Sequence, residues 1–519
     1  MPIIPKDNAA RRALLAWIGA SLAVALPILC HVNLPLIDLP AHLARHYLST
    51  YEGGVLDRFY EYRFSLVPNS AVDLMWYWAG FGSPERFSQI VMALYAVLFV
   101  TSTMVLARAV QGAWRVWPAT AALLVYNAAF FWGFQNFLVS VPLAVLTLAL
   151  WYATEQMRTW QRLLIFFPIV TLIYVMHLYA FIGLGLAAAG REIQRLVEAP
   201  KGARGAQFLS GAALSLPFVL CCVWLLYDLS IAGPNPNGGG TAYGTLLARI
   251  RLPIQMLYAP NGAGSDWIFL AFKLKVGLLV AFAIAFLIGF WKGRLALLTL
   301  ERKVTGSVIA LTLGCLAAPT KLSGVFYSDL RLPLFLGIMF FAATSWRNLS
   351  PTIEKSLAVL VAAVLIFNGI SFERFAKNYD ADIHDLLRVS RAIPEGARVL
   401  AVRDSQPEMF DARLWHVDAF VVIHAAAFIP TLFQGVHNFS VKPEWRHASI
   451  PQGVPPGKQA LDGDHVLAKN AALRFMQNWQ RDFTHILLLD PEATPPVAQA
   501  YLQETAKDGR FTLYTVKRP

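Results

Sequence analysis

Charged residues are scarce in this chain of 519 residues. Asp, Glu, Lys and Arg together make up only 15% of the chain, whereas 56% of it is hydrophobic. In a soluble globular protein about a quarter of the residues are charged, so most of this chain does not have the composition of a soluble protein. The apolar residues also occur in runs that are long enough to cross a bilayer. The sequence therefore predicts a polytopic α-helical membrane protein.

Cysteine is also rare, and no common cofactor signature is present. The four cysteines lie in apolar stretches, which indicates small buried side chains rather than a disulfide framework or a metal site. There is no zinc signature, no GxGxxG, no P-loop and no GxSxG. The sequence predicts no cofactor. A divalent-metal site at Asp38 has little support, because Asp38 has no partner carboxylate in a D-x-D arrangement. The cysteines are Cys30, Cys221, Cys222 and Cys315.

The net charge of +12 does not indicate nucleic acid as a partner. Most Lys and Arg residues lie in short loops between apolar runs, where positive charge sets the orientation of membrane helices. This pattern predicts a multi-pass protein of the bacterial inner membrane with a cytoplasmic N-terminus. The first apolar run has no small-residue cleavage site before Pro27, so we expect it to stay as a membrane helix.

About eleven apolar runs predict the membrane spans. The fifth and sixth are short enough to form a bent or re-entrant pair. An odd number of spans places the residues after Ile370 outside the cytoplasm. The runs are Ala13–Cys30, Phe87–Ala109, Trp117–Phe131, Phe137–Tyr152, Leu163–Met176, Tyr179–Ala189, Phe208–Leu229, Trp267–Trp291, Val304–Ala318, Leu332–Trp346 and Leu357–Ile370.

Two external segments look like helices lying in the membrane interface. The first external loop runs over residues 31–84 and contains Ser70–Phe81, which is aromatic but too short to span. The second segment is Thr245–Tyr258, an amphipathic run with two arginines. Before it, Gly233–Gly240 is rich in glycine and proline and is expected to form a mobile lid.

The composition becomes soluble after residue 370, which predicts two domains, 1–370 in the membrane and 371–519 outside it. Alternating elements in the second part indicate an extracytoplasmic α/β domain. We expect strands at Arg398–Val402, Thr484–Leu489 and Phe511–Val516, and helices at Ile383–Ile393 and Val497–Lys507.

One polar stretch follows the first apolar run. Pro35 and Pro40 predict a loop that turns into a helix, on which Asp38, His42 and Arg45 have the i, i+4 and i+7 spacing of one face. An acid, an imidazole and a guanidinium would thus meet at the membrane surface. Alternatively, Asp38 caps the helix and Arg45 anchors it in the interface.

Other polar groups are predicted on the same side of the membrane. Each has a structural alternative: lysines can snorkel, Asp329 can pair with Arg331, and His177 can satisfy a backbone group. Their shared location nevertheless favours a substrate or phosphate site, because ionisable groups near a membrane are usually functional. They are His177, Lys273, Lys275, Lys321, Asp329 and Arg331, with Asn127 and Asn136 bracketing a turn nearby.

The first span, the long loop with its acidic residue and the interfacial helices resemble the GT-C class of integral-membrane glycosyltransferases. The resemblance covers Arg11 to about Ile370, although this chain lacks the DD, DE or ED pair of many members. It implies that Asp38 is the catalytic base and that Lys273, Lys275 and Arg331 hold the donor phosphate. If Asp38 is not the base, His42 on the same helix face is the next candidate. The donor would be a polyprenyl-phosphate sugar, and the acceptor a glycan, lipid or protein.

Two other functions fit a membrane protein of this kind. A lipid or glycan transporter, or flippase, would show two halves of similar hydropathy and charges near the midplane of the membrane. Here the charges cluster at one surface instead. A non-catalytic envelope-assembly protein would explain the external domain, but not the polar groups that converge beside the membrane. The sequence therefore favours an inverting glycosyltransferase acting at the outer face.

Overall fold

A computed structural model of the protein describes most of the chain. The described residues are 7–63, 66–231, 240–258, 266–292, 298–322, 325–347, 349–404, 410–433, 439–450, 453–461, 471–490 and 500–517.

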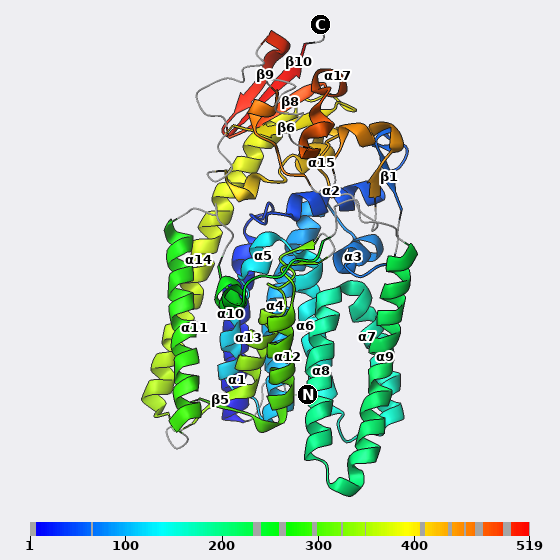
Figure 1. Ribbon diagram of the computed structural model, residues 1–519. Coiled ribbons are helices and arrows are strands. Elements are labelled where there is room, and N and C mark those ends of the chain that lie inside the picture. Colours follow the sequence, from blue (N-terminus) through cyan, green and yellow to red (C-terminus); the bar gives the residue numbers. More distant parts are fainter. Residues whose placement is uncertain are drawn as a thin grey trace.

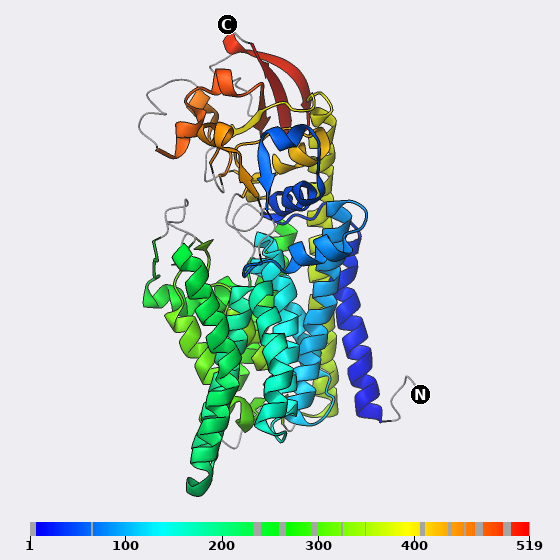
Figure 2. The ribbon, with the colours of Figure 1, turned by 90° about the vertical axis from the view of Figure 1, so that its right-hand side faces the viewer.

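Long helices form a bundle, and a smaller part that contains a β-sheet lies at one end of it (Figures 1 and 2). Seven helices within the described ranges are long and apolar enough to cross a membrane. The helices of the bundle are α1 (Asn8–Leu29), α4 (Pro84–Gln111), α6 (Gln135–Ala153), α7 (Thr159–Met176), α8 (Leu178–Glu198), α9 (Arg204–Ile231), α11 (Asp266–Lys292), α12 (Thr305–Ala317), α13 (Pro333–Ala343) and α14 (Pro351–Ser390).

Three of the predicted runs differ from the structure. The run Trp117–Phe131 is not a continuous α-helix, since it forms the 3-10 segment η2 (Trp117–Leu124) and the short helix α5 (Ala128–Trp132). Asn127 starts the second piece, because its side chain accepts a hydrogen bond from the backbone N–H of Phe130. The fifth and sixth runs form the separate helices α7 and α8, not a re-entrant pair.

Residues 31–84, the loop predicted to be the first external loop, are largely folded. This loop contains α2 (Leu39–Thr50), η1 (Val55–Arg58), β1 (Tyr60–Tyr62) and α3 (Ala71–Ala79), and α2 and α3 lie between the bundle and the C-terminal part (Figure 1). Both predicted interfacial segments are helical, as α3 and as α10 (Leu246–Gln255). The predicted lid lies outside the described residues except for Gly240.

The C-terminal part contains a four-stranded sheet in the order β6-β8-β10-β9. The strands are β6 (Val399–Arg403), β8 (His485–Leu489), β9 (Leu502–Asp508) and β10 (Phe511–Val516), and β6 is parallel to β8. The predicted helix Val497–Lys507 is wrong, because β9 pairs antiparallel with β10 across a turn at Gly509. Gly509 has a φ of +48°, and the Asp-Gly pair is a hairpin signal that should have overruled the helix.

Short elements complete the structure. Paired strands outside the main sheet are β2 (Leu298–Leu300) with β5 (Thr344–Trp346), and β3 (Lys321–Leu322) with β4 (Val325–Phe326). The remaining helical segments are η3 (Lys201–Ala203), η4 (Arg302–Val304), η5 (Ala412–Leu414), α15 (Ala419–Ala425), η6 (Pro443–Ala448), η7 (Lys458–Leu461), η8 (Ala471–Met476) and α17 (Trp479–Asp482).

The C-terminal part is bound to the membrane part at several points. Helix α14 runs through residue 370, where the sequence predicts the domain boundary, and enters the C-terminal part (Figure 2). Strand β1 of the first external loop pairs antiparallel with β7 (Phe439–Val441). His424 lies 3.0 Å from the carboxylate of Glu85 at the start of α4. The first external loop and the C-terminal part therefore form one structure above the bundle.

Helices α8 and α12 approach each other closely at two glycines. A Cβ added to Gly190 would collide with the backbone carbonyl of Gly306, and the reverse also holds. Nearby, the hydroxyl of Ser307 donates to the carbonyl of Ala187 at 2.6 Å. Small residues allow membrane helices to make such contacts, which replace the hydrophobic effect as the source of helix association in lipid.

We predict that Gly190→Ala lowers the stability of the folded protein by about 1–3 kcal/mol, because the two backbones must separate. The melting temperature of the detergent-solubilised protein would measure the loss. Gly277→Ala in α11 is the matched control, since a Cβ there meets nothing within 4 Å. Equal melting temperatures for the two variants would contradict the close contact.

Candidate functional site

The backbone of Asp38 is fixed against the end of helix α5. The N–H of Ile37 donates to the carbonyl of Phe131 at 2.9 Å, and that of Asp38 to the carbonyl of Trp132 at 3.0 Å. Gly133 follows with a φ of +78°, and a Cβ on it would lie 3.1 Å from the Asp38 nitrogen. A glycine is needed here both for the left-handed conformation and for the close approach.

The carboxylate of Asp38 does not cap helix α2. Asp38 occupies the N-cap position, but its side chain makes no capping hydrogen bond. The side chain is 17% exposed. Burial raises the pKa of Asp38 to about 7, against the attraction of the Arg331 guanidinium. A carboxyl group that exchanges a proton near neutral pH is suited to general-base catalysis.

Two neutral imidazoles lie near Asp38. Nε2 of His416, from the C-terminal part, is 3.6 Å from Oδ1 of Asp38, and burial lowers the pKa of His416 to about 3. Burial, aided by Arg45, also holds the pKa of His42 well below its usual value. The ring of Phe433 lies edge-on to both, with centroid distances of 4.7 Å to His416 and 5.8 Å to His42.

The predicted grouping of Asp38, His42 and Arg45 is divided in the structure. Arg45 is buried, its Nη2 donates to Oδ2 of Asp73 at 2.8 Å, and its Nε lies 2.8 Å from Oδ1. Asp73 also accepts a hydrogen bond from Asn136 at 3.2 Å. Burial alone would raise the pKa of Asp73, but Arg45 and His46 outweigh it and hold that pKa far below its usual range.

The Arg45–Asp73 pair therefore joins three elements, α2, α3 and α6. Asp73 was missed from the sequence, although an acidic residue inside the apolar run of α3 could have indicated it. Arg45 is neither an interfacial anchor nor open to a substrate in this geometry, because its guanidinium is buried against a carboxylate.

Arg331 is the cation whose charge acts on the carboxylate of Asp38. Its Nη1 donates to the carbonyls of Phe326 and Tyr327, and its guanidinium lies 4.3 Å from the ring centroid of Phe134. Burial lowers the pKa of Arg331 to about 10, so it stays charged at neutral pH. Within the described ranges its buried Nε has no hydrogen-bond partner. This leaves a donor that an anion could use.

Several predicted ligands are occupied elsewhere. Nδ1 of His177 accepts from the backbone N–H of Tyr179 at 3.0 Å, so His177 caps helix α8. Nζ of Lys275 is buried and donates to the carbonyl of Tyr126 at 2.6 Å. Lys273 is exposed, with its ammonium 5.1 Å from the ring centroid of Phe269. Of these three residues, His177 lies close enough to Arg331 for the guanidinium charge to act on its imidazole.

The remaining predicted residues lie around the β3–β4 hairpin and helix α6. Nζ of Lys321 is 4.7 Å from the ring centroid of Phe326. Asp329 is buried, and burial raises its pKa. Asn136 accepts from the backbone N–H of Val72 and donates to the carbonyl of Asn69. It thus fixes the start of α3.

Aromatic rings beside Asp38 were not identified from the sequence. Trp132 lies 4.5 Å from Tyr327 and 5.6 Å from Trp415, measured between ring centroids. Tyr327 has a φ of +55°, which is strained for a side chain of this size, and strain of this kind gathers at functional sites. Only the charged members of this cluster gave a sequence signal, because aromatic residues are common throughout a membrane protein.

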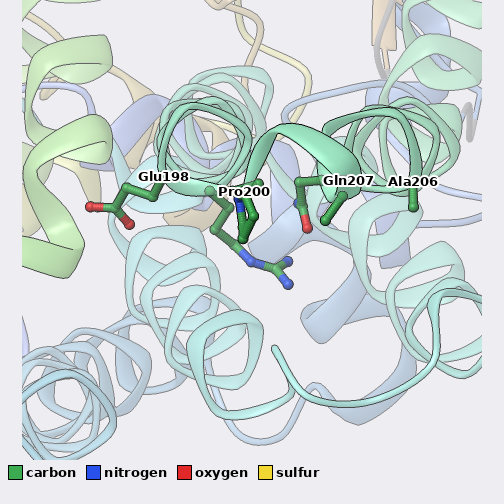
Figure 3. Close-up of a pocket in the computed structure, with 7 residues that line it drawn as sticks. Glu198, Pro200, Ala206 and Gln207 are labelled. Carbon is green, nitrogen blue, oxygen red and sulfur yellow. The ribbon is translucent and has the colours of Figure 1, made fainter.

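A pocket of about 440 Å³ lies far from this site, at the hairpin between α8 and α9 (Figure 3). Its lining includes Glu198 and Gln207, and it lies at the opposite end of α8 from His177, roughly 30 Å away along the helix. No group of three or more metal-binding side chains occurs in the described ranges. The polar cluster around Asp38 is therefore the candidate site.

We predict that Asp73→Asn destabilises the protein by about 3–5 kcal/mol, because it leaves the buried Arg45 without a counter-charge. Thermal unfolding would measure the effect. Glu61→Gln is the control, since it removes the partner of Arg63 in an exposed pair and should cost less than about 1 kcal/mol. A small effect of Asp73→Asn would show that the pair does not hold the loop in place.

The chain was finally compared with known proteins. In sequence, it matches no protein-family profile and none of the curated proteins compared with it. In structure, it is similar to ArnT from Cupriavidus metallidurans, solved bound to undecaprenyl phosphate. The TM-score is 0.52 with 12% sequence identity, over 96% of this chain and 97% of ArnT. The protein therefore shares the fold of ArnT over nearly its whole length.

Proposed function

We propose that the protein is an inverting glycosyltransferase that moves a sugar from a polyprenyl-phosphate donor to an envelope acceptor. The observation that carries the proposal is the partly exposed carboxylate of Asp38 next to the charge of Arg331, on an ArnT-like fold. ArnT binds undecaprenyl phosphate in its solved structure, and a related lipid is the donor we expect here.

In the proposed reaction, Asp38 takes the proton of the acceptor hydroxyl. The acceptor oxygen attacks the anomeric carbon, the bond from this carbon to the phosphate oxygen breaks, and polyprenyl phosphate leaves with the electron pair. One direct displacement inverts the anomeric centre. Arg331 stabilises the negative charge that grows on the phosphate, which is where fixed cations help most.

Among the predicted phosphate ligands, Arg331 is the one that the geometry supports. Its buried Nε has no partner in the described part of the chain, whereas the ammonium of Lys275 binds a backbone carbonyl. Arg45 is occupied by Asp73. We further propose that the site faces the outside of the inner membrane, with the N-terminus in the cytoplasm, because basic residues dominate the loops at the other end.

We predict that Asp38→Asn lowers kcat by roughly 10²–10⁴ while the protein stays folded, because Asn cannot accept the proton. Release of free polyprenyl phosphate from a labelled donor would measure turnover. The wild-type rate should rise with pH through about 7, since only deprotonated Asp38 is a base. The same variant should melt no lower than the wild type, because it removes a buried charge.

Near-normal turnover in Asp38→Asn would contradict the catalytic role. Asp38→Ala is a second test, since a merely structural aspartate would reduce the amount of folded protein and leave the turnover of that protein intact.

We predict that Arg331→Gln raises the KM for the donor, because one charge-assisted contact to phosphate contributes about 1.5–3 kcal/mol, or roughly 10- to 100-fold. Arg63→Gln is the matched control, since Arg63 is an exposed arginine of the first external loop. Unchanged donor KM in folded Arg331→Gln would place the phosphate elsewhere.

A further inference from the structure

We propose that His416 is a positioning residue for Asp38, so that the C-terminal part of the chain completes the site at the membrane. This inference rests on the proposed function, in which Asp38 is the base. It gives the C-terminal part a role in the reaction itself, beyond its attachment to the bundle.

The segment that carries His416 is held against the site from three directions. Helix α15 follows it and packs against α2, the helix that begins after Asp38. Trp415 lies 5.6 Å from Trp132, whose carbonyl binds the Asp38 backbone. The ring of Phe433 contacts His416 edge-on. His416 is only 5% exposed, so its ring has little freedom to turn away from Asp38.

The distance between His416 and Asp38 and the neutral state of the imidazole suit a weak hydrogen bond that forms when either side chain moves slightly. Nε2 of His416 is 3.6 Å from Oδ1 of Asp38, slightly beyond hydrogen-bonding distance, so a small movement of either side chain makes the bond. Because burial keeps the imidazole neutral, it can donate an N–H without bringing a proton that competes for the base. Such a donor favours the carboxylate form of Asp38 and fixes its direction.

Other titratable groups face this pair and must be considered in any pH measurement. The charge of Arg331 lowers the pKa of Asp38, and the charge of Asp38 raises the pKa of the Tyr327 phenol. His416 in turn lowers the pKa of His42. Tyr327 and His42 stay neutral around pH 7, since burial raises the pKa of the phenol and lowers that of the imidazole. Arg331 stays charged. Asp38 is therefore the group of this cluster that titrates near pH 7.

A second histidine provides a matched control. Nε2 of His424, on α15, lies 3.0 Å from Oε1 of Glu85 and thus joins the same two parts of the protein. If His416 only held the C-terminal part in place, loss of either histidine would have the same consequence. If His416 positions Asp38, only its loss will change the protonation of Asp38.

The test measures the protonation of Asp38 directly in the full-length protein. A water-soluble carbodiimide with an amine nucleophile modifies protonated carboxyl groups, and peptide mass spectrometry reports the modification of Asp38 against pH. The labelling yield of the exposed Glu52 serves as an internal reference for the change in reagent reactivity with pH. We expect His416→Phe to move the Asp38 midpoint upward by about 0.5–1 pH unit, because the carboxylate loses the donor that a small movement would bring to it from the C-terminal part in the proposed arrangement.

His416→Gln should restore much of the wild-type midpoint, because its side-chain amide also donates. His424→Gln should leave the midpoint unchanged. The inference is overturned if His416→Phe leaves the midpoint in place, or if His424→Gln moves it equally. Melting temperatures identify any variant that fails to fold. If His416→Phe does not fold, His416→Leu, which also lacks the side-chain donor, carries the test with the same expected upward shift.

The pH profile of kcat separates this inference from the proposed function. Its acid limb should move with the labelling midpoint in His416→Phe. If wild-type protein releases polyprenyl phosphate with an acid limb that depends on Asp38, but the His416 variants do not move that limb, only the role of His416 is refuted. If wild-type protein transfers no sugar from any polyprenyl-phosphate donor, the proposed function fails, whatever the labelling shows.

Discussion

Two backbone hydrogen bonds, from Ile37 and Asp38 to the carbonyls at the end of α5, determine the geometry of the site. Near a membrane every peptide group needs a partner, so a helix that stops there leaves carbonyls that must be satisfied. Helix α5 ends at Trp132, and the first external loop supplies the missing donors. Gly133 admits the loop because it has no side chain. The break in an otherwise apolar run thus becomes the place where a carboxylate is held.

Hydrophobicity predicted most of the helices but not the contacts between distant segments. The apolar runs became helices because lipid leaves the backbone few alternatives. The run Trp117–Phe131 is divided because Asn127 starts a new helix, and Leu502–Asp508 is a strand, not part of a helix, because it pairs with β10. Asp38 could be selected from its place after the first span. Asp73 could have been noticed as an acid within an apolar run, but its pairing with Arg45 is a tertiary contact that the sequence does not indicate. His416 could not be selected, since its importance comes from its tertiary contact with Asp38.

Two acids in the same region, Asp73 buried and Asp38 partly exposed, show opposite shifts of the carboxyl pKa. Asp73 has a guanidinium and an amide against it, so its charge is fully compensated and it contributes to structure. Asp38 has a cation near it but no bidentate partner, and burial therefore raises its pKa to about 7. An incompletely satisfied carboxylate costs stability, and proteins keep such groups mainly where a reaction needs them. The contrast favours Asp38 over Asp73 as the reacting group.

The chain shares the fold of ArnT over 96% of its length at only 12% sequence identity. Such a low identity is consistent with a few residues, such as Asp73 and Asp38, having specific roles while most positions only need to be apolar. A bilayer requires apolar helices but accepts many apolar residues at each position, so most of the sequence is weakly specified. Strict requirements fall on a few places: glycines where backbones touch, paired charges that hold the loop, and polar groups around Asp38. The polar groups around Asp38 are contributed by the loop over residues 31–84, the region after the β3–β4 hairpin and the C-terminal part. The site therefore exists only in the assembled fold, and its recognition depends on structure rather than on a contiguous motif.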